Sequence, residues 1–275
     1  MSAAIVEHAS LLESVLKRDR SVVIAALAVV SILAWAYTLA GVGLSMNALE
    51  MTGMAEMGTV LATPTPWSPA YASAVFMMWL IMMIAMMVPS AAPMILLFSA
   101  VARSRNAQSG FQLKTAAFLS GYLAIWALFS TCAALMHWGL ERTGLLTPMM
   151  TPTSAFLGGM LLLAAGLYQL TPLKHACLQS CRHPIGFITR HWRTGAGGAF
   201  HMGVLHGTFC LGCCWALMAL LFFGGVMNLY WIAGIATYVL VEKLVPHGRW
   251  LSYAASALLI IWGSSILGSA ISVHG

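Results

Sequence analysis

Three cysteines and a histidine lie within the short segment 206–214. On a helix that turns by about 100° per residue, His206, Cys210 and Cys213 fall within a sector of roughly 60°, and Cys214 lies beside them. Thiolates and imidazoles are ligands for soft and borderline metal ions. The segment therefore predicts a metal site on one face of a helix, although cysteines are also common as small buried apolar residues.

A second pair of thiols precedes this segment. Cys177 and Cys181 are four residues apart, so they lie on one side of a short helix if Pro172 begins it. They meet Cys210 and Cys213 near the cytoplasmic boundary if the loop that carries them folds inward. The alternative is a reduced cytosolic loop whose basic residues contact anionic lipid head groups.

Methionines are concentrated in a polar loop and in an apolar run. The loop holds Met51, Met54 and Met57, and the run places Met82 and Met86 four residues apart on one helical face. Thioethers bind Cu(I) but hold zinc or magnesium poorly. Both groups are candidate copper ligands, with flexible apolar packing as the competing interpretation.

The composition indicates the class of protein that holds these ligands. Hydrophobic residues make up 60% of the 275 residues and charged residues only 7%, whereas soluble domains carry about 25% charge. We expect an all-α polytopic transmembrane bundle, with a cytoplasmic segment at 1–20 and one metal-binding membrane domain at 21–275. Apolar runs of about spanning length predict seven helices, at about 21–44, 71–100, 115–138, 154–171, 199–223, 230–245 and 251–272.

The basic residues give the orientation. Twelve of the 13 Lys and Arg residues fall before the first run or in alternate loops, and Arg142 alone falls on the other side. This positive-inside pattern predicts a cytoplasmic N terminus and an external C terminus. Despite the net charge of +6, no basic run is interleaved with aromatic residues, so we expect no nucleic-acid partner.

One acidic residue lies within a predicted span. Glu242 is followed directly by Lys243 near the end of the sixth run. Ionisable groups at such depth are costly unless they are paired or hydrated. Glu242 is a candidate metal ligand or proton acceptor, and the role that we favour is pairing with Lys243 or a neighbouring arginine.

Four ordered motifs carry a resemblance to a known family. They are MM-x-A-MM-x-P at 82–89, PLK-x-x-C-L-x-x-C-R-x-P at 172–184, C-x-G-C-C-W-x-L-M at 210–218 and the E-K pair at 242–243. Over about 79–249 the chain resembles an uncharacterised bacterial family of predicted metal-binding integral membrane proteins. The resemblance implies a multi-pass protein of the bacterial inner (cytoplasmic) membrane, metal binding and a small soluble partner protein, but no particular reaction. The order of methionine and cysteine ligands is also similar to that of eukaryotic copper transporters, as an analogy of chemistry.

These ligands favour copper as the bound metal, with zinc as the alternative. We expect a membrane protein that handles Cu(I) by uptake, transfer or delivery, with the lipid bilayer, a small soluble protein and a homo-oligomer as further partners. The rival interpretation is a membrane-embedded copper-dependent oxidase or monooxygenase, or its metal-binding subunit, acting on a small apolar substrate. A third is an assembly subunit with a structural metal. The sequence alone leaves transport and catalysis both open.

Overall fold

The computed structural model describes residues 2–41, 47–56, 66–105, 110–146, 154–245 and 249–274. The regular elements in these ranges are all α-helices, which confirms the predicted all-α class. They are α1 (Ser2–Leu39), α2 (Ala48–Glu56), α3 (Pro69–Arg105), α4 (Phe111–Arg142), α5 (Ala155–Gln169), α6 (Pro172–Arg182), α7 (Pro184–His191), α8 (Gly195–Ala219), α9 (Leu221–Gly224), α10 (Leu229–Leu244) and α11 (Arg249–His274).

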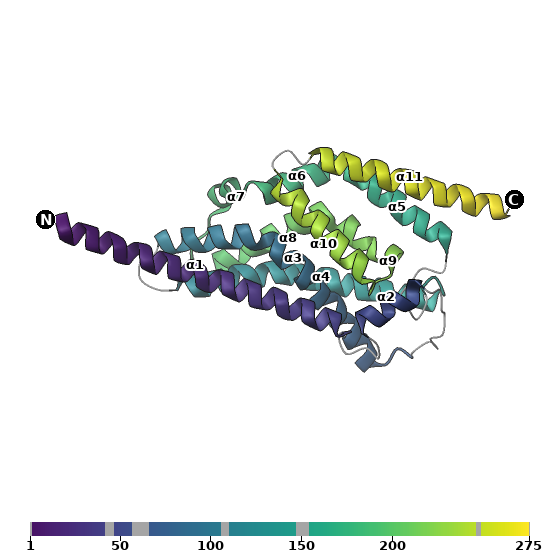
Figure 1. Cartoon of the computed structure of the whole chain (residues 1–275), viewed down its shortest axis with the longest axis horizontal. Helices are drawn as coiled ribbons and strands as arrows, with labels where there is room; N and C mark the ends of the chain where they lie inside the picture. Colours follow the sequence, from purple (N-terminus) through teal and green to yellow (C-terminus); the bar gives the residue numbers. More distant parts are fainter. Residues whose placement is uncertain are drawn as a thin grey trace.

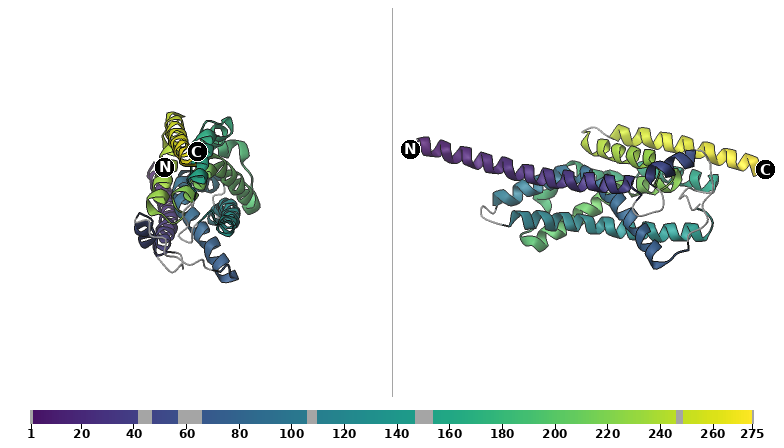
Figure 2. Two further views of the ribbon diagram at one scale, coloured as in Figure 1. Left: turned by 90° about the vertical axis from the view of Figure 1, so that its right-hand side faces the viewer. Right: turned by 60° about the horizontal axis from the view of Figure 1, so that its bottom comes forward.

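The long helices run roughly along the long axis of the molecule, with the two termini at opposite ends (Figure 1). The helix pairs with the most extensive contacts are α4 with α8, α5 with α11, and α3 with both α1 and α4. Viewed along the axis, the helices form a bundle, with α11 near one edge (Figure 2). Residues of α3 and α8 therefore lie in the interior, where the candidate ligands are found.

Each of the seven predicted apolar runs coincides with a helix, but the helices differ in length. Five are long and apolar enough to cross a membrane: Arg20–Leu39, Pro69–Arg105, Phe111–Arg142, Gly195–Gly224 and Arg249–Ser272. The pair α5 and α6 makes a sixth candidate if its two parts, bent by 64°, are one broken span. The helix in the remaining run, α10, has 16 residues. Within the described residues, five or six of the seven predicted runs therefore meet the length and composition expected of a membrane span.

The bend between α5 and α6 has a local cause. Thr171 has an extended backbone, and its side chain accepts a hydrogen bond from the Lys174 amide at 3.3 Å, as an N-cap residue does. Pro172 occupies the first turn of α6, where its missing N–H is tolerated. The chain therefore starts a new helix in a new direction, and α6 packs against α8. This is the inward fold that brings the 177–181 segment toward the segment 206–214.

Glycines allow α4 and α8 to approach closely. A Cβ atom on Gly203 would overlap the Phe118 carbonyl, and one on Gly121 would overlap the Phe200 carbonyl. Small residues at helix contacts permit such backbone proximity in membrane bundles. The close approach sets Tyr122 of α4 against Cys210 of α8.

Candidate metal centre

The cysteines of α8 share one buried face, as their spacing predicts. Cys210, Cys213 and Cys214 are at most 1% exposed. The Sγ atoms of Cys213 and Cys214 each donate to the Cys210 carbonyl oxygen at 3.0 Å. Three thiols therefore occupy about one turn of a helix at the centre of the bundle.

Of the two thiols on α6, Cys181 joins this group. Its half-buried side chain interacts with those of Cys210 and Cys213. Cys177 instead packs beside Gly212, where a Cβ atom would lie 2.7 Å from the Cys177 Sγ atom. The predicted pair is thus divided, with Cys181 beside the thiols of α8 and Cys177 on α6 against Gly212.

A methionine of α3 completes the set of sulfur atoms. The Cys214 Sγ lies 3.8 Å from the Met87 Sδ. Met82 and Met86, the predicted ligands on this helix, are buried, and the thiol contact is made by the neighbouring Met87. We refer to Cys181, Cys210, Cys213, Cys214 and Met87 as the sulfur cluster.

The side chains of the three loop methionines predicted as copper ligands are not among those that the structure describes. Met57 lies outside the described residues. Met51 and Met54 lie in α2, but their side chains are not among those described. The start of this helix is fixed by a reciprocal cap, in which the Glu50 amide donates to Asn47 Oδ1 at 2.8 Å and the Asn47 amide donates to Glu50 Oε2 at 3.1 Å.

A lysine side chain reaches into the sulfur cluster. The Lys243 Nζ donates to Cys210 Sγ at 3.0 Å and to Ser90 Oγ at 2.9 Å. The Tyr122 hydroxyl lies 3.2 Å from the same Cys210 sulfur and also donates to the Met87 carbonyl at 3.2 Å. Sequence reasoning missed this role of Lys243. The available signal was a basic residue inside an apolar run, where a nearby counter-charge is expected.

Glu242 belongs to a separate polar cluster. Its Oε1 atom forms a 2.5 Å ion pair with Lys174 and accepts from the Tyr238 hydroxyl at 3.0 Å. Its carbonyl oxygen accepts from Arg182 Nε at 2.9 Å. The favoured pairing role is therefore correct, but the partner of the carboxylate is Lys174 and not Lys243. The Oε1 atom is engaged by Lys174 and Tyr238, which favours the pairing role over that of metal ligand.

His206 lies one turn before Cys210 beside a small cavity. Its ring stacks with that of Tyr122 at 5.7 Å, and its Nδ1 atom is buried without a hydrogen-bond partner among the described residues. The cavity, of about 140 Å³, is also lined by Cys181, Lys243 and Ser90. An unsatisfied imidazole nitrogen next to a polar cavity is suited to bind a ligand that enters it.

The donor set suits a soft monovalent ion. No group of three or more His, Cys, Asp or Glu side chains in the described ranges is arranged so that it could hold a metal ion by itself. A structural zinc site commonly has four fixed ligands in tetrahedral geometry. Cu(I) is stably coordinated by two or three sulfur donors. Thiolates and thioethers are the ligands that select it.

Comparison with known protein families places the chain in one of them. The family model described as "PpoB2: Copper chaperone" matches residues 76–266. This range includes the whole sulfur cluster, Lys243 and His206, and it covers more than half of the chain. No curated protein and no solved structure matches.

Proposed function

Because the chain belongs to the PpoB2 copper chaperone family, we propose that it is a membrane-embedded protein that binds Cu(I) at the sulfur cluster and passes the ion to an acceptor. The observation that carries this proposal is the proximity of three buried thiols of α8, the half-buried Cys181 of α6 and the buried Met87 thioether of α3. Such an all-sulfur group, without a carboxylate among its members, favours copper over magnesium, calcium or manganese.

Charge also favours a monovalent ion. Two thiolates and one Cu(I) carry a net charge of −1, which the ammonium of Lys243 can balance at 3.0 Å from Cys210. The same two thiolates are neutralised fully by Zn(II), which would leave the ammonium without a counter-charge in an apolar interior. An unpaired buried charge is costly, so this lysine supports Cu(I) over zinc.

The buried methionines of α3 offer a route to the sulfur cluster. Met78, Met82 and Met86 repeat every four residues, about 6 Å apart along the helix axis at 1.5 Å per residue. All three are almost fully buried. We propose that Cu(I) from the loop methionines Met51, Met54 and Met57 is exchanged between these thioethers. Weak, sequential binding is what conduction requires.

The cavity beside His206 is the proposed exit. It reaches Cys181 and Lys243, so an ion released by Cys210 enters a polar space next to α6. Cys177, on α6 beside Gly212, is then an acceptor-facing thiol. The acceptor that we propose is a small soluble partner protein at this side.

The proposed orientation has a cytoplasmic N terminus and seven spans in a bacterial cytoplasmic membrane, with α10 as the shortest. The distribution of basic residues supports it. So do the positions of the two termini at opposite ends of the bundle, as an odd number of spans requires (Figure 1). The residues 21–275 then form one metal-binding membrane domain. We also propose that the chain forms a homo-oligomer.

Uptake of isotopically enriched copper into proteoliposomes tests this function. We expect uptake with the native protein, and loss of uptake with the double variant Cys210→Ser, Cys213→Ser. Cys132→Ser is the matched control, since this exposed thiol lies on α4 outside the sulfur cluster. If the native protein binds copper but none enters the vesicles, the proposal of transport across the membrane is wrong. The remaining function is then delivery of copper within one leaflet.

A further inference from the structure

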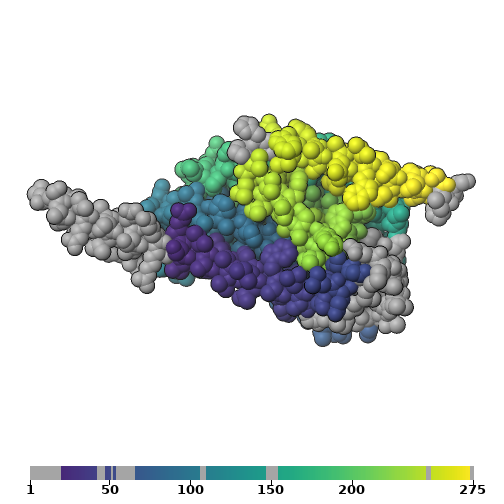
Figure 3. All heavy atoms as spheres, in the orientation of Figure 1, coloured from purple at the N-terminus to yellow at the C-terminus, as the bar shows by residue number. Residues whose placement is uncertain are grey.

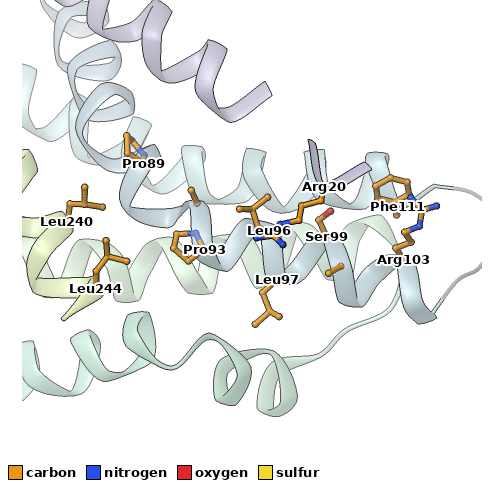
Figure 4. A pocket seen from close by; sticks show the side chains of 12 residues that line it. Arg20, Pro89, Pro93, Leu96, Leu97, Ser99, Arg103, Phe111, Leu240 and Leu244 are labelled. Atoms are coloured by element: carbon orange, nitrogen blue, oxygen red, sulfur yellow. The ribbon is translucent and has the colours of Figure 1, made fainter. Parts of the chain in front are cut away.

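A large groove lies between α1, α3 and α10, with a volume of about 640 Å³ (Figure 4). Pro93, Leu240 and Leu244 line one end of it, and Arg103 with Phe111 lines the other. Arg20 of α1 reaches the groove close to Ser99. On the face drawn in Figure 3, α3 is visible in blue between α1 in purple and α10 in yellow-green.

The lining is amphipathic and carries two arginines, Arg103 beside Phe111 at one end and Arg20 beside Leu96 and Ser99 (Figure 4). Arg20 is exposed, and the Arg103 guanidinium lies 5.2 Å from the centre of the Phe111 ring. Two arginines and Ser99 are the polar members of the lining, none of whose residues is acidic, and the others are apolar. Arginine binds phosphate oxygens in a fixed, often bidentate geometry. The groove is therefore complementary to a molecule with an anionic head and an apolar chain.

The dimensions agree with one lipid in one leaflet. Pro89 and Arg103 both line the groove on α3, and at 1.5 Å per residue they are about 21 Å apart along the helix axis. Half of a bilayer's hydrocarbon core measures about 15 Å, and the head-group region adds several ångström. The volume also falls within the range of about 300–1,000 Å³ that is usual for ligand sites.

We propose that this groove binds an anionic phospholipid, with the phosphate at Arg20 and Arg103 and an acyl chain along Pro89 and Pro93. The proposal rests on the membrane insertion assumed in the proposed function, but not on copper binding. In the proposed orientation the arginine end faces the cytoplasm. Basic pockets between membrane helices on that side are known to hold anionic head groups.

The groove adjoins the metal centre. Pro93 and Leu244 line both the groove and the small cavity beside His206. Leu244 directly follows Lys243, whose Nζ contacts Cys210. A lipid chain in the groove packs against the wall that holds this lysine in place. We therefore expect lipid binding to stabilise the contact between α3 and α10.

Lipid binding to the full-length protein in detergent, without added copper, tests the proposal. The probes are phosphatidylglycerol, phosphatidylcholine with the same acyl chains, and glycerophosphate, with bound lipid detected by native mass spectrometry and the unfolding temperature measured in parallel. We expect phosphatidylglycerol to bind at least tenfold more tightly than phosphatidylcholine, and to raise the unfolding temperature. We expect glycerophosphate to have no effect.

The double variant Arg20→Gln, Arg103→Gln is expected to lose the preference for phosphatidylglycerol. Arg105→Gln, Arg142→Gln is the matched control, since both of these arginines lie over aromatic rings, as Arg103 does, but do not line the groove. Arg20→Gln alone, at an exposed position, reports on the site if the double variant does not fold. Its expected effect is a loss of at least threefold in affinity.

Several outcomes would overturn the lipid proposal. Equal binding of both phospholipids would reduce the site to an apolar contact, and binding of glycerophosphate would make it a site for free phosphate. An unchanged preference in the double variant would place the lipid elsewhere, and oligomerisation without lipid binding would make this face a contact between copies. A protein that binds copper but not phosphatidylglycerol refutes this inference alone, and the reverse result refutes the proposed function alone.

Discussion

The ammonium of Lys243 lies 3.0 Å from the sulfur of Cys210, although the two residues come from different helices, α10 and α8. Ser90 of α3 holds the same ammonium at 2.9 Å. A cation is thus fixed at the point where the thiols of the sulfur cluster meet. The arrangement provides the counter-charge that a monovalent metal with two thiolates needs.

Replacing Lys243 by methionine is expected to weaken Cu(I) binding by about tenfold or more. A hydrogen bond to a charged group contributes about 1.5–3 kcal/mol, and 1.4 kcal/mol corresponds to tenfold in affinity. Lys243→Arg keeps the charge and is expected to restore most of the loss. Competition with a Cu(I) chelator under anaerobic conditions measures both variants. Equal Cu(I) affinities of Lys243→Met and the native protein would show that Lys243 does not contribute to the metal site.

Replacing Met87 by leucine is expected to weaken Cu(I) binding without unfolding the protein. A swap between methionine and leucine conserves volume and costs less than about 1.5 kcal/mol of stability. The matched control is Met77→Leu on the same helix, since Met77 is 41% exposed. X-ray absorption of the copper-loaded protein should show one sulfur neighbour fewer in Met87→Leu only. An unchanged spectrum would assign Met87 to packing.

Local periodicity was enough to predict part of this site. The shared face of Cys210, Cys213 and Cys214 follows from helix geometry alone. The contribution of Cys181 depends on the bend at Thr171 and Pro172, which the sequence suggests only as a possible helix start. Periodicity could not choose between Met86 and Met87, because adjacent methionines point to different neighbours and the packing of α3 was unknown.

The contacts between distant segments could not be predicted. Glu242 and Lys243 are adjacent in sequence, but successive residues of a helix point in different directions. Their side chains therefore reach different partners, Lys174 and Cys210. Similarly, nothing in the sequence pairs Tyr122 with Cys210. The helical class and the positions of the seven apolar runs were predicted, because they depend on composition and period within single segments.

The buried ion pair of Lys174 and Glu242 is expected to support the fold and not the metal. Glu242→Gln leaves the Lys174 ammonium buried without its counter-charge, which typically costs about 3–5 kcal/mol. The double variant Lys174→Met, Glu242→Gln should recover part of this stability. Thermal unfolding in detergent measures the order of the three proteins. The copper content of folded Glu242→Gln should equal that of the native protein, and a loss there would make Glu242 a ligand.

The contact of α4 with α8 is expected to be sensitive to one added methyl group. Gly203→Ala forces the Cβ atom against the Phe118 carbonyl, and overpacking of this kind costs about 1–3 kcal/mol. Gly197→Ala is the control, since a Cβ atom there meets nothing within 4 Å, and alanine favours the helix by about 1 kcal/mol. The unfolding temperature should fall in Gly203→Ala and stay level or rise in Gly197→Ala. Equal temperatures would mean that the helices separate without cost.

The metal content of the protein tests the central claim most directly. The native protein and Cys210→Ser, Cys213→Ser are purified anaerobically in detergent and compared by elemental analysis, with Cys132→Ser as the control. We expect about one copper ion per chain in the native protein and the control, and little in the double variant, because thiolates are the ligands that select Cu(I). Zinc in place of copper, or equal copper in all three proteins, would contradict a Cu(I) site at the sulfur cluster.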